Sequence, residues 1–195
     1  MLGLAVIDGM ITEMSLADDP SRIVRLASNV LKALPCSDAA VMAEAARVFA
    51  RLTATGGLLM IGPATNQLKI GLEWLQGERI EARRWAAVYL LLELANQVPN
   101  LVYDQIPYLL DNIWTALRDP RNGVREVAAL VMGRCLDIAY TRDGPLKGEW
   151  YKMVYDQADA AFRSGTPDNV HAAILAVQAL FVNTQNVRAQ TLRRR

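Results

Sequence analysis

Apolar residues recur every three or four positions along most of the chain, which is the spacing of one face of an α-helix. The clearest stretch runs from Ile106 to Leu136. One apolar stripe fills its first half (Ile106, Leu109, Leu110, Ile113, Trp114, Leu117), and a second fills the rest (Val124, Val127, Ala128, Val131, Met132, Cys135). An Asp-Pro-Arg-Asn-Gly turn separates them, since its proline and glycine end one helix and an Asp or Asn can cap the next. The stretch therefore predicts an antiparallel helix hairpin.

The same spacing predicts helices along the whole chain, and no segment alternates like a strand over a useful length. We therefore predict an all-α fold. We expect one array over residues 1–195, with a half hairpin at about 1–16, hairpins at about 20–54, 64–98, 99–140 and 147–183, and a tail at 184–195. The apolar stripe of the first helix (Leu4, Ile7, Met10, Ile11, Met14) has no partner before it, so we expect the chain to be a segment of a longer protein.

Glycine and proline predict where individual helices end. Gly56-Gly57 and Gly62-Pro63 predict two breaks, with an irregular stretch or a short helical turn at 58–61 and a helix that starts only at Asn66. The helix from Ile80 to Val98 is expected to be the longest.

Small residues recur at a regular interval in the predicted second helix of each hairpin. Ala45, Ala86, Ala128 and Ala173 stand at comparable places in successive hairpins, and their spacing falls within the range of about 40–47 residues typical of HEAT or armadillo units. An alanine lets helix axes approach to roughly 8–10 Å. The repetition predicts an α-solenoid of HEAT-like antiparallel hairpins.

The turn before the second helix of the 99–140 hairpin also resembles the HEAT pattern. Asp119 lies in the turn, and a Val-Arg pair that ends at Arg125 enters the helix. In HEAT proteins these residues form a ladder between neighbouring repeats. Arg83 stands one repeat before Arg125, but Met42 stands at the comparable place in the first hairpin. The resemblance therefore implies an incomplete inter-repeat ladder of Asp119, Arg125 and Arg83.

Composition and charge exclude several classes of protein. A hydrophobic fraction of 52% excludes disorder. The formal net charge of +1 argues against nucleic-acid binding, which favours a strong basic excess. Two cysteines in apolar surroundings are too few for a disulfide framework or a thiolate metal site. No stretch approaches the roughly 18 apolar residues of a membrane span, so direct membrane insertion is not expected.

The sequence offers little chemistry for catalysis. His171 is the single histidine, and Cys135 lies on an apolar helix face, so a packing or surface role explains each of them. No glycine-rich phosphate loop and no kinase catalytic tripeptide occurs. Four tryptophans (Trp74, Trp85, Trp114, Trp150) fall within apolar stripes, which favours core packing over stacking on nucleic-acid bases. We predict no catalytic, cofactor-binding or metal-binding residues, and no enzyme activity in this chain.

A longer set of residues resembles one family. In order, these are Trp74, Arg83-Arg84, Glu93-Leu94-Ala95, Pro99, Asp111-Asn112-Ile113-Trp114, Leu117-Arg118-Asp119-Pro120, Arg125-Glu126, Cys135-Leu136 and Glu149-Trp150-Tyr151. Together they resemble the amino-terminal HEAT array of the target-of-rapamycin (TOR) kinases, which are phosphatidylinositol-kinase-related serine/threonine kinases. The resemblance covers most of residues 68–182, and the part through Leu52 matches more loosely. It implies a parent protein whose catalytic domain lies outside this sequence.

The resemblance implies a scaffold for other proteins. In that family the amino-terminal solenoid helps to build the dimeric TOR complex and offers a surface to Raptor, the substrate-recruiting subunit. The implied partners are a Raptor-like subunit, the remainder of the TOR chain and a second TOR copy, in the cytoplasm and at the lysosome or vacuole surface through partners. The candidate partner surface consists of charged residues outside the apolar stripes: Glu81, Arg84, Asp104, Arg118, Arg121 and Glu126.

Other interpretations remain open from the sequence. A solvated face explains the six charged residues more simply than a partner surface does. A stand-alone HEAT-repeat adaptor, of the transport or phosphatase-scaffold type, would share the fold without the parent kinase. Nucleic-acid binding would require a basic groove, which the near-neutral charge does not favour.

Overall fold

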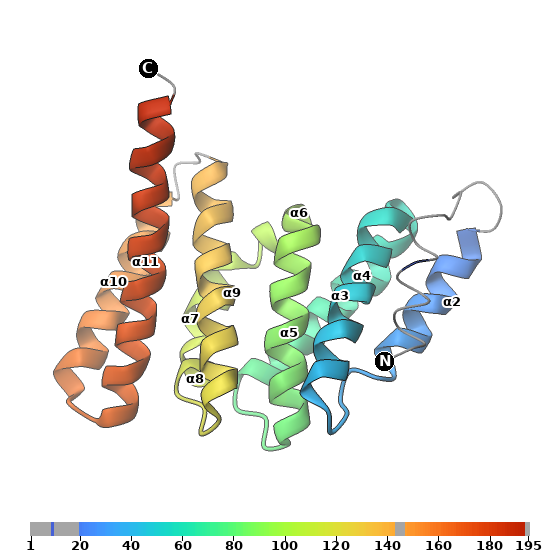
Figure 1. The fold of residues 1–195 in the computed structure, drawn as a ribbon, viewed down its shortest axis with the longest axis horizontal. Helices are drawn as coiled ribbons and strands as arrows, with labels where there is room; N and C mark the ends of the chain where they lie inside the picture. The colour runs from blue at the N-terminus through green and yellow to red at the C-terminus, as the bar shows by residue number, and fades with distance from the viewer. Residues whose placement is uncertain (1–8, 10–19, 143–146, 194–195) are drawn as a thin grey trace. The chain divides into compact units, whose positions relative to one another are not determined.

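Helices make up the described part of the chain. The computed structural model describes residues 9, 20–142 and 147–193, and these residues form helices joined by turns, with no strand among them (Figure 1). The all-α fold class is therefore confirmed. The predicted half hairpin at about 1–16 lies outside the described residues, apart from residue 9.

The chain divides into two compact units, Met1–Val102 and Tyr103–Arg195. Each unit is described by itself below. The expected single array over residues 1–195 stays a prediction.

Two hairpins form the described part of the first unit (Figure 1). Helix α2 (Pro20–Leu31) packs on α3 (Ala39–Gly56), and α4 (Leu58–Leu75) packs on α5 (Glu81–Gln97). Asp38 begins α3 in the expected way, since its side chain accepts hydrogen bonds from the amides of Ala40 and Val41. The second helices, α3 and α5, also pack along each other. This arrangement is that of stacked helical repeats.

The second unit repeats the arrangement. Helices α7 (Ile106–Asn112) and α8 (Trp114–Leu117) pack on α9 (Asn122–Thr141), and α10 (Lys147–Ser164) packs on α11 (Pro167–Arg193). Helices α9 and α11 pack along each other, as α3 and α5 do. The short α6 (Pro99–Tyr103) spans the boundary between the units. All four repeated alanines, Ala45, Ala86, Ala128 and Ala173, are fully buried.

The predicted break at Gly62-Pro63 is wrong, because α4 runs without interruption from Leu58 and contains Pro63. A residue before proline usually avoids helical geometry since its Cβ meets the proline ring, but Gly62 has no Cβ. Met60, Ala64 and Leu68 form one buried stripe through the predicted break, and this burial offsets the hydrogen bond that the proline cannot donate. The α5 helix has 17 residues and is shorter than the 20-residue α9, so the expected longest helix is also wrong.

The apolar stripe of 106–117 is confirmed as buried, although two helices carry it. Ile113 separates α7 from α8, yet its own dihedral angles are helical (φ −63°, ψ −20°). Its amide donates to the Leu109 carbonyl at 2.9 Å, and its carbonyl accepts from the Leu117 amide at 3.0 Å. One backbone hydrogen bond on each side of Ile113 therefore connects it to α7 and to α8.

Candidate functional site

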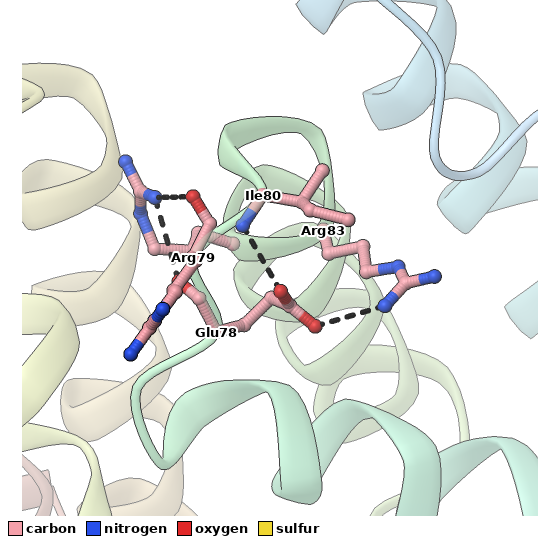
Figure 2. A network of polar contacts seen from close by, with 5 residues as sticks. Glu78, Arg79, Ile80 and Arg83 are labelled. Carbon is pink, nitrogen blue, oxygen red and sulfur yellow. Dashed lines mark hydrogen bonds and ion pairs between the residues drawn. The ribbon is translucent and has the colours of Figure 1, made fainter.

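The turn that leads into α5 carries a network of polar contacts (Figure 2). A Glu78 carboxylate oxygen accepts a hydrogen bond from the Ile80 amide at 3.0 Å, immediately before α5 begins. The Arg84 guanidinium, one turn into the helix, donates to the Arg79 carbonyl at 3.0 Å and to the Glu78 carbonyl at 3.4 Å. The first helical turn and the preceding loop are therefore fastened together by side chains.

The turn that leads into α9 is built in the same way. The Asp119 carboxylate accepts from the Arg121 amide at 2.8 Å, and the Arg125 guanidinium donates to the Asp119 carbonyl at 3.2 Å. In both turns the acid stands two residues before the N-cap and the arginine four residues after it. We call this arrangement the turn clamp. It consists of Glu78, Ile80 and Arg84 in the first unit, and of Asp119, Arg121 and Arg125 in the second.

The turn clamp changes which arginine corresponds to Arg125. The repeat spacing of the sequence paired Arg125 with Arg83, whereas the geometry pairs it with Arg84, the next residue along the chain. One residue rotates a side chain by about 100° around a helix, so neighbouring arginines reach different groups. Arg83 instead donates to the Glu78 carboxylate at 3.0 Å and lies over the Trp74 ring, 5.8 Å from its centroid. The sequence contained a signal for the pairing of Arg84 with Arg125. The separation along the chain between Glu78 and Asp119 equals the separation between Arg84 and Arg125.

The implied inter-repeat ladder stays a prediction. Arg83 contacts Glu78 within its own turn, and Arg125 contacts the Asp119 carbonyl and, at 3.1 Å, the Asn122 side chain within its own turn. A ladder from Arg83 to Asp119 would join the two units.

The Glu78 carboxylate is the ionised partner in the first clamp. The hydrogen bond from the Ile80 amide and the guanidinium of Arg83 lower its pKa from the ordinary value, because both favour the charged form. A lowered pKa in the folded state means that the stabilisation is present above the unfolded-state pKa and is lost as pH falls through the folded-state pKa. The first turn is therefore expected to loosen in acid.

The candidate partner residues fall into two groups, one in each unit. Glu81 and Arg84 lie at the α4–α5 turn, while Arg118, Arg121 and Glu126 lie at the α8–α9 turn and Asp104 lies between α6 and α7. Arg84 is half-buried in its clamp, and the other five are exposed. Whether the six residues contact a partner stays a prediction.

Two residues of the second group, Arg118 and Glu126, already form hydrogen bonds within this chain. Arg118 donates to the Trp114 carbonyl at 3.0 Å and to the Asn169 side chain at 3.1 Å, which ties the start of α11 to α8. Glu126 accepts from the Asn122 side chain at 2.7 Å. These contacts orient the Arg118 and Glu126 side chains at the α8–α9 turn.

The side chains most able to do chemistry are set in packing positions. Burial raises the pKa of the Cys135 thiol to about 12, so the thiol is protonated and a poor nucleophile at neutral pH. His171 is half-buried, and its Nδ1 has no hydrogen-bond partner. Over the part of the chain that the structure describes, no group of His, Cys, Asp and Glu could hold a metal ion, and no helix is long and apolar enough to cross a membrane.

The predicted core position is confirmed for two of the four tryptophans. Trp114 and Trp150 are buried, and Trp150 meets Tyr103 edge to face with ring centroids 5.5 Å apart. Trp74 and Trp85 are half-buried, so the expected core position is only partly right for them. Trp85 stacks on Tyr89 at 5.4 Å within α5, and Trp74 lies under Arg83.

Stacked helix hairpins with clamped turns define a segment of the helical-repeat class. No protein-family model matches the chain. It is 33% identical to serine/threonine-protein kinase tor1 of Schizosaccharomyces pombe over 89% of its length. It is 32% identical over 91% to TOR2 of Saccharomyces cerevisiae, and 30% identical over 94% to TOR of Oryza sativa. The chain is therefore homologous to a short segment of the TOR serine/threonine-protein kinases.

That segment is a small part of each relative. The chain spans 7% of the S. pombe protein and 8% of each of the other two. The described residues form a helical segment without a kinase fold. The amino-terminal location of the matching segment stays a prediction.

Proposed function

We propose that this chain is a non-catalytic scaffold segment of a TOR serine/threonine kinase, which helps to assemble the nutrient-sensing TOR complex. The observation that carries the proposal is homology over about nine tenths of the chain to a 7–8% segment of TOR kinases. The all-helical fold supports it, since helical repeats form extended surfaces on which other proteins bind.

The turn clamps suggest how such a surface works. Hairpin packing buries the apolar stripes and leaves the turns exposed, where the clamps fix the backbone next to charged side chains. Charges held in place lose less conformational entropy on binding, and they select partners of complementary charge. We propose Glu81, Arg84, Asp104, Arg118, Arg121 and Glu126 as partner-contacting residues.

The proposed partners are a Raptor-like substrate-recruiting subunit, the remainder of the TOR chain and a second TOR copy. The proposed location is the cytoplasm, with recruitment to the lysosome or vacuole surface through these partners. The positions of the charges at the hairpin turns support protein contacts.

Charge reversal in the full-length parent tests the surface. Arg118→Glu with Arg121→Glu is expected to reduce co-purification of the substrate-recruiting subunit several-fold. Arg163→Glu, at an exposed arginine that pairs with Asp159 on α10, is the matched control and should leave co-purification unchanged. Because Arg118 also holds Asn169, the variant Arg118→Gln with Arg121→Gln and a thermal melt separate lost charge from lost folding. Unchanged co-purification with unchanged melting would contradict the proposed surface.

The mass of the endogenous gene product tests the parent itself. A mass more than ten times the 21.5 kDa of this chain is expected for a TOR kinase. A mass near 21.5 kDa would instead indicate a stand-alone helical-repeat adaptor.

A further inference from the structure

The turn between α10 and α11 is exposed together with the helix ends on either side of it. Residues 162–168 are all exposed, and no other run of exposed residues in the described part of the chain is as long. Helix α10 ends at Ser164, and α11 begins at Pro167. Between them, Gly165 has φ +69°, the left-handed conformation in which many helices end. An enzyme that modifies side chains can therefore approach this turn from solvent.

Two hydroxyl groups lie in this turn, and they differ in their contacts. The Ser164 hydroxyl donates to the Ala161 carbonyl at 2.7 Å and accepts from the Asn169 side-chain amide at 2.8 Å. The Thr166 hydroxyl forms no hydrogen bond with any described residue. Thr166 therefore presents an exposed hydroxyl whose oxygen is free to react, whereas that of Ser164 is engaged twice.

The residues on either side of Thr166 fit a phosphorylation site. Pro167 follows it directly, and of the eight prolines in the chain only this one follows a serine or threonine. Proline disfavours helical geometry at the preceding residue, which favours an extended Thr166. Protein kinases bind their acceptor as an extended segment, and proline-directed kinases accept a following residue that has no amide hydrogen. Arg163, three residues before Thr166, adds an exposed cation that pairs with Asp159 at 2.6 Å.

The surroundings of Thr166 also favour a phosphate group. Thr166 stands directly before α11, and its carbonyl accepts from the Val170 amide at 2.9 Å. Negative charge at a helix N-terminus is stabilised by the helix dipole, although Asp168 beside it opposes a second negative charge. Asn169 accepts from the Arg118 guanidinium at 3.1 Å, so an arginine of the α8–α9 turn reaches this end of α11 (Figure 1).

We infer that Thr166 is a phosphorylation site for a proline-directed serine/threonine protein kinase that uses ATP. The Thr166 hydroxyl oxygen attacks the γ-phosphorus of ATP, the bond from that phosphorus to the bridging oxygen breaks, and ADP leaves. The hydroxyl proton passes to a base of the kinase. The phosphate carries a charge of about −1.5 to −2 at pH 7, and Arg118 is its cationic partner. Phosphorylation thus adds a link between the α8–α9 turn and the start of α11. This inference does not depend on the proposed function.

Phosphorylation of the folded 195-residue chain tests the site. A purified proline-directed kinase with Mg²⁺ and ATP is expected to add one phosphoryl group, which peptide mass spectrometry should locate on Thr166. Thr166→Ala and Pro167→Ala should each lower the initial rate at least tenfold, whereas Thr166→Ser should keep at least half of it. A thermal melt of each variant shows that it is folded.

Ser164→Ala is the matched control, since it removes the neighbouring exposed hydroxyl and should leave the rate unchanged. The inference would be overturned if the folded chain took up no phosphate, or took it up at another hydroxyl. Phosphorylation of Thr166 only after unfolding in urea would also overturn it, because the folded turn would then fail to present the residue.

Unfolding of the phosphorylated chain tests the link to Arg118. Phosphorylation of Thr166 is expected to raise the urea midpoint, and Arg118→Gln should remove at least half of that rise. Arg22→Gln, at an exposed arginine of α2 in the first unit, is the control and should leave the rise unchanged. A midpoint that phosphorylation does not raise, or a rise that Arg118→Gln leaves intact, would overturn Arg118 as the partner of the phosphate.

Discussion

Single buried side chains account for the close packing of the second helices. Ala45 and Ala86 are fully buried in the unit where α3 and α5 lie together, and Ala128 and Ala173 are fully buried in the unit where α9 and α11 lie together. A larger side chain at these positions would force the packed helices apart, and overpacking typically costs about 1–3 kcal/mol. The regular spacing of these alanines is therefore a consequence of the stacking.

Glu93 on α5 is expected to cost stability at neutral pH. Burial raises its pKa, an effect that Arg47 opposes and Glu44 reinforces. Because the folded-state pKa lies above the unfolded-state value, the cost is present above the folded-state pKa and disappears as pH falls below the unfolded-state value. Glu93→Gln should raise the free energy of unfolding at pH 7 by under about 1 kcal/mol, and should have no such effect at pH 3.

Urea unfolding at the two pH values measures the Glu93 effect. Glu73→Gln, at an exposed glutamate on α4, is the control and should change little at either pH. A Glu93→Gln variant less stable than the parent at pH 7 would show that the carboxylate makes a favourable interaction in the folded state.

The two cysteines should differ in reactivity. Cys135 is fully buried with a pKa of about 12, whereas Cys36 is half-buried and its thiol donates to the Asp38 carbonyl at 3.3 Å. Since the thiolate is the reactive species, a disulfide reagent at pH 8 should modify one thiol per folded chain and two per chain in denaturant. Cys36→Ser should then abolish the reaction of the folded protein. Rapid modification of two thiols in the folded chain would contradict the burial of Cys135.

At the scale of elements, the hairpin turns decide how the helices follow one another. The turn clamp occurs before α5 and α9, where an acid bonds the N-cap amide and an arginine bonds the acid's carbonyl. Before α3 the cap is instead Asp38 itself, bonded to two amides of the first turn. Both devices satisfy amides that would otherwise lack partners at a helix start.

The corner between α3 and α4 depends on glycine at position 57. Gly57 has φ +52° and ψ −130°, a conformation that side chains with a Cβ rarely adopt, although the space around it is open. Gly57→Ala should therefore lower the free energy of unfolding by about 1–3 kcal/mol through backbone strain alone. Thermal or urea unfolding measures the change.

Gly148→Ala is the matched control for this substitution. Gly148 lies in the first turn of α10, with open space around it and no positive φ. Alanine there should leave stability unchanged or raise it by under about 1 kcal/mol. A Gly57→Ala variant as stable as the parent would contradict the conformation of the corner.

At the scale of the whole molecule, charge makes a further prediction. The chain has 21 Lys and Arg against 20 Asp and Glu, so its net charge is +1. Electrostatic retention by a polyanion requires many uncompensated cations. The chain should therefore elute from heparin at or below physiological salt, while a strongly basic protein of similar size is retained. Retention that weakens steadily with added salt would revive nucleic-acid binding.

The sequence determined the helical class, because the spacing of apolar residues along the chain shows which residues of a helix can face a core. The stripe from Ile106 to Leu117 is buried as its spacing predicts, and the four alanines stand at the repeated interval. The order of the matching residues between Trp74 and Tyr151 likewise indicated the similarity to TOR kinases. The identity to tor1 of S. pombe and TOR2 of S. cerevisiae confirms that similarity. Local pattern was sufficient for the buried stripe because its burial follows from the spacing of neighbouring residues, and the alanine interval and the family similarity follow from the order of residues along the chain.

Only the tertiary structure decided the details that depend on contacts between helices. Pro63 alone predicts a break, but burial of Met60, Ala64 and Leu68 against other helices keeps α4 continuous. The match of Arg84 rather than Arg83 to Arg125 required the positions of the turn carbonyls. A propensity of about 3 kcal/mol at one residue is smaller than the burial energy of several apolar side chains. Packing therefore overrides local preference wherever the two conflict.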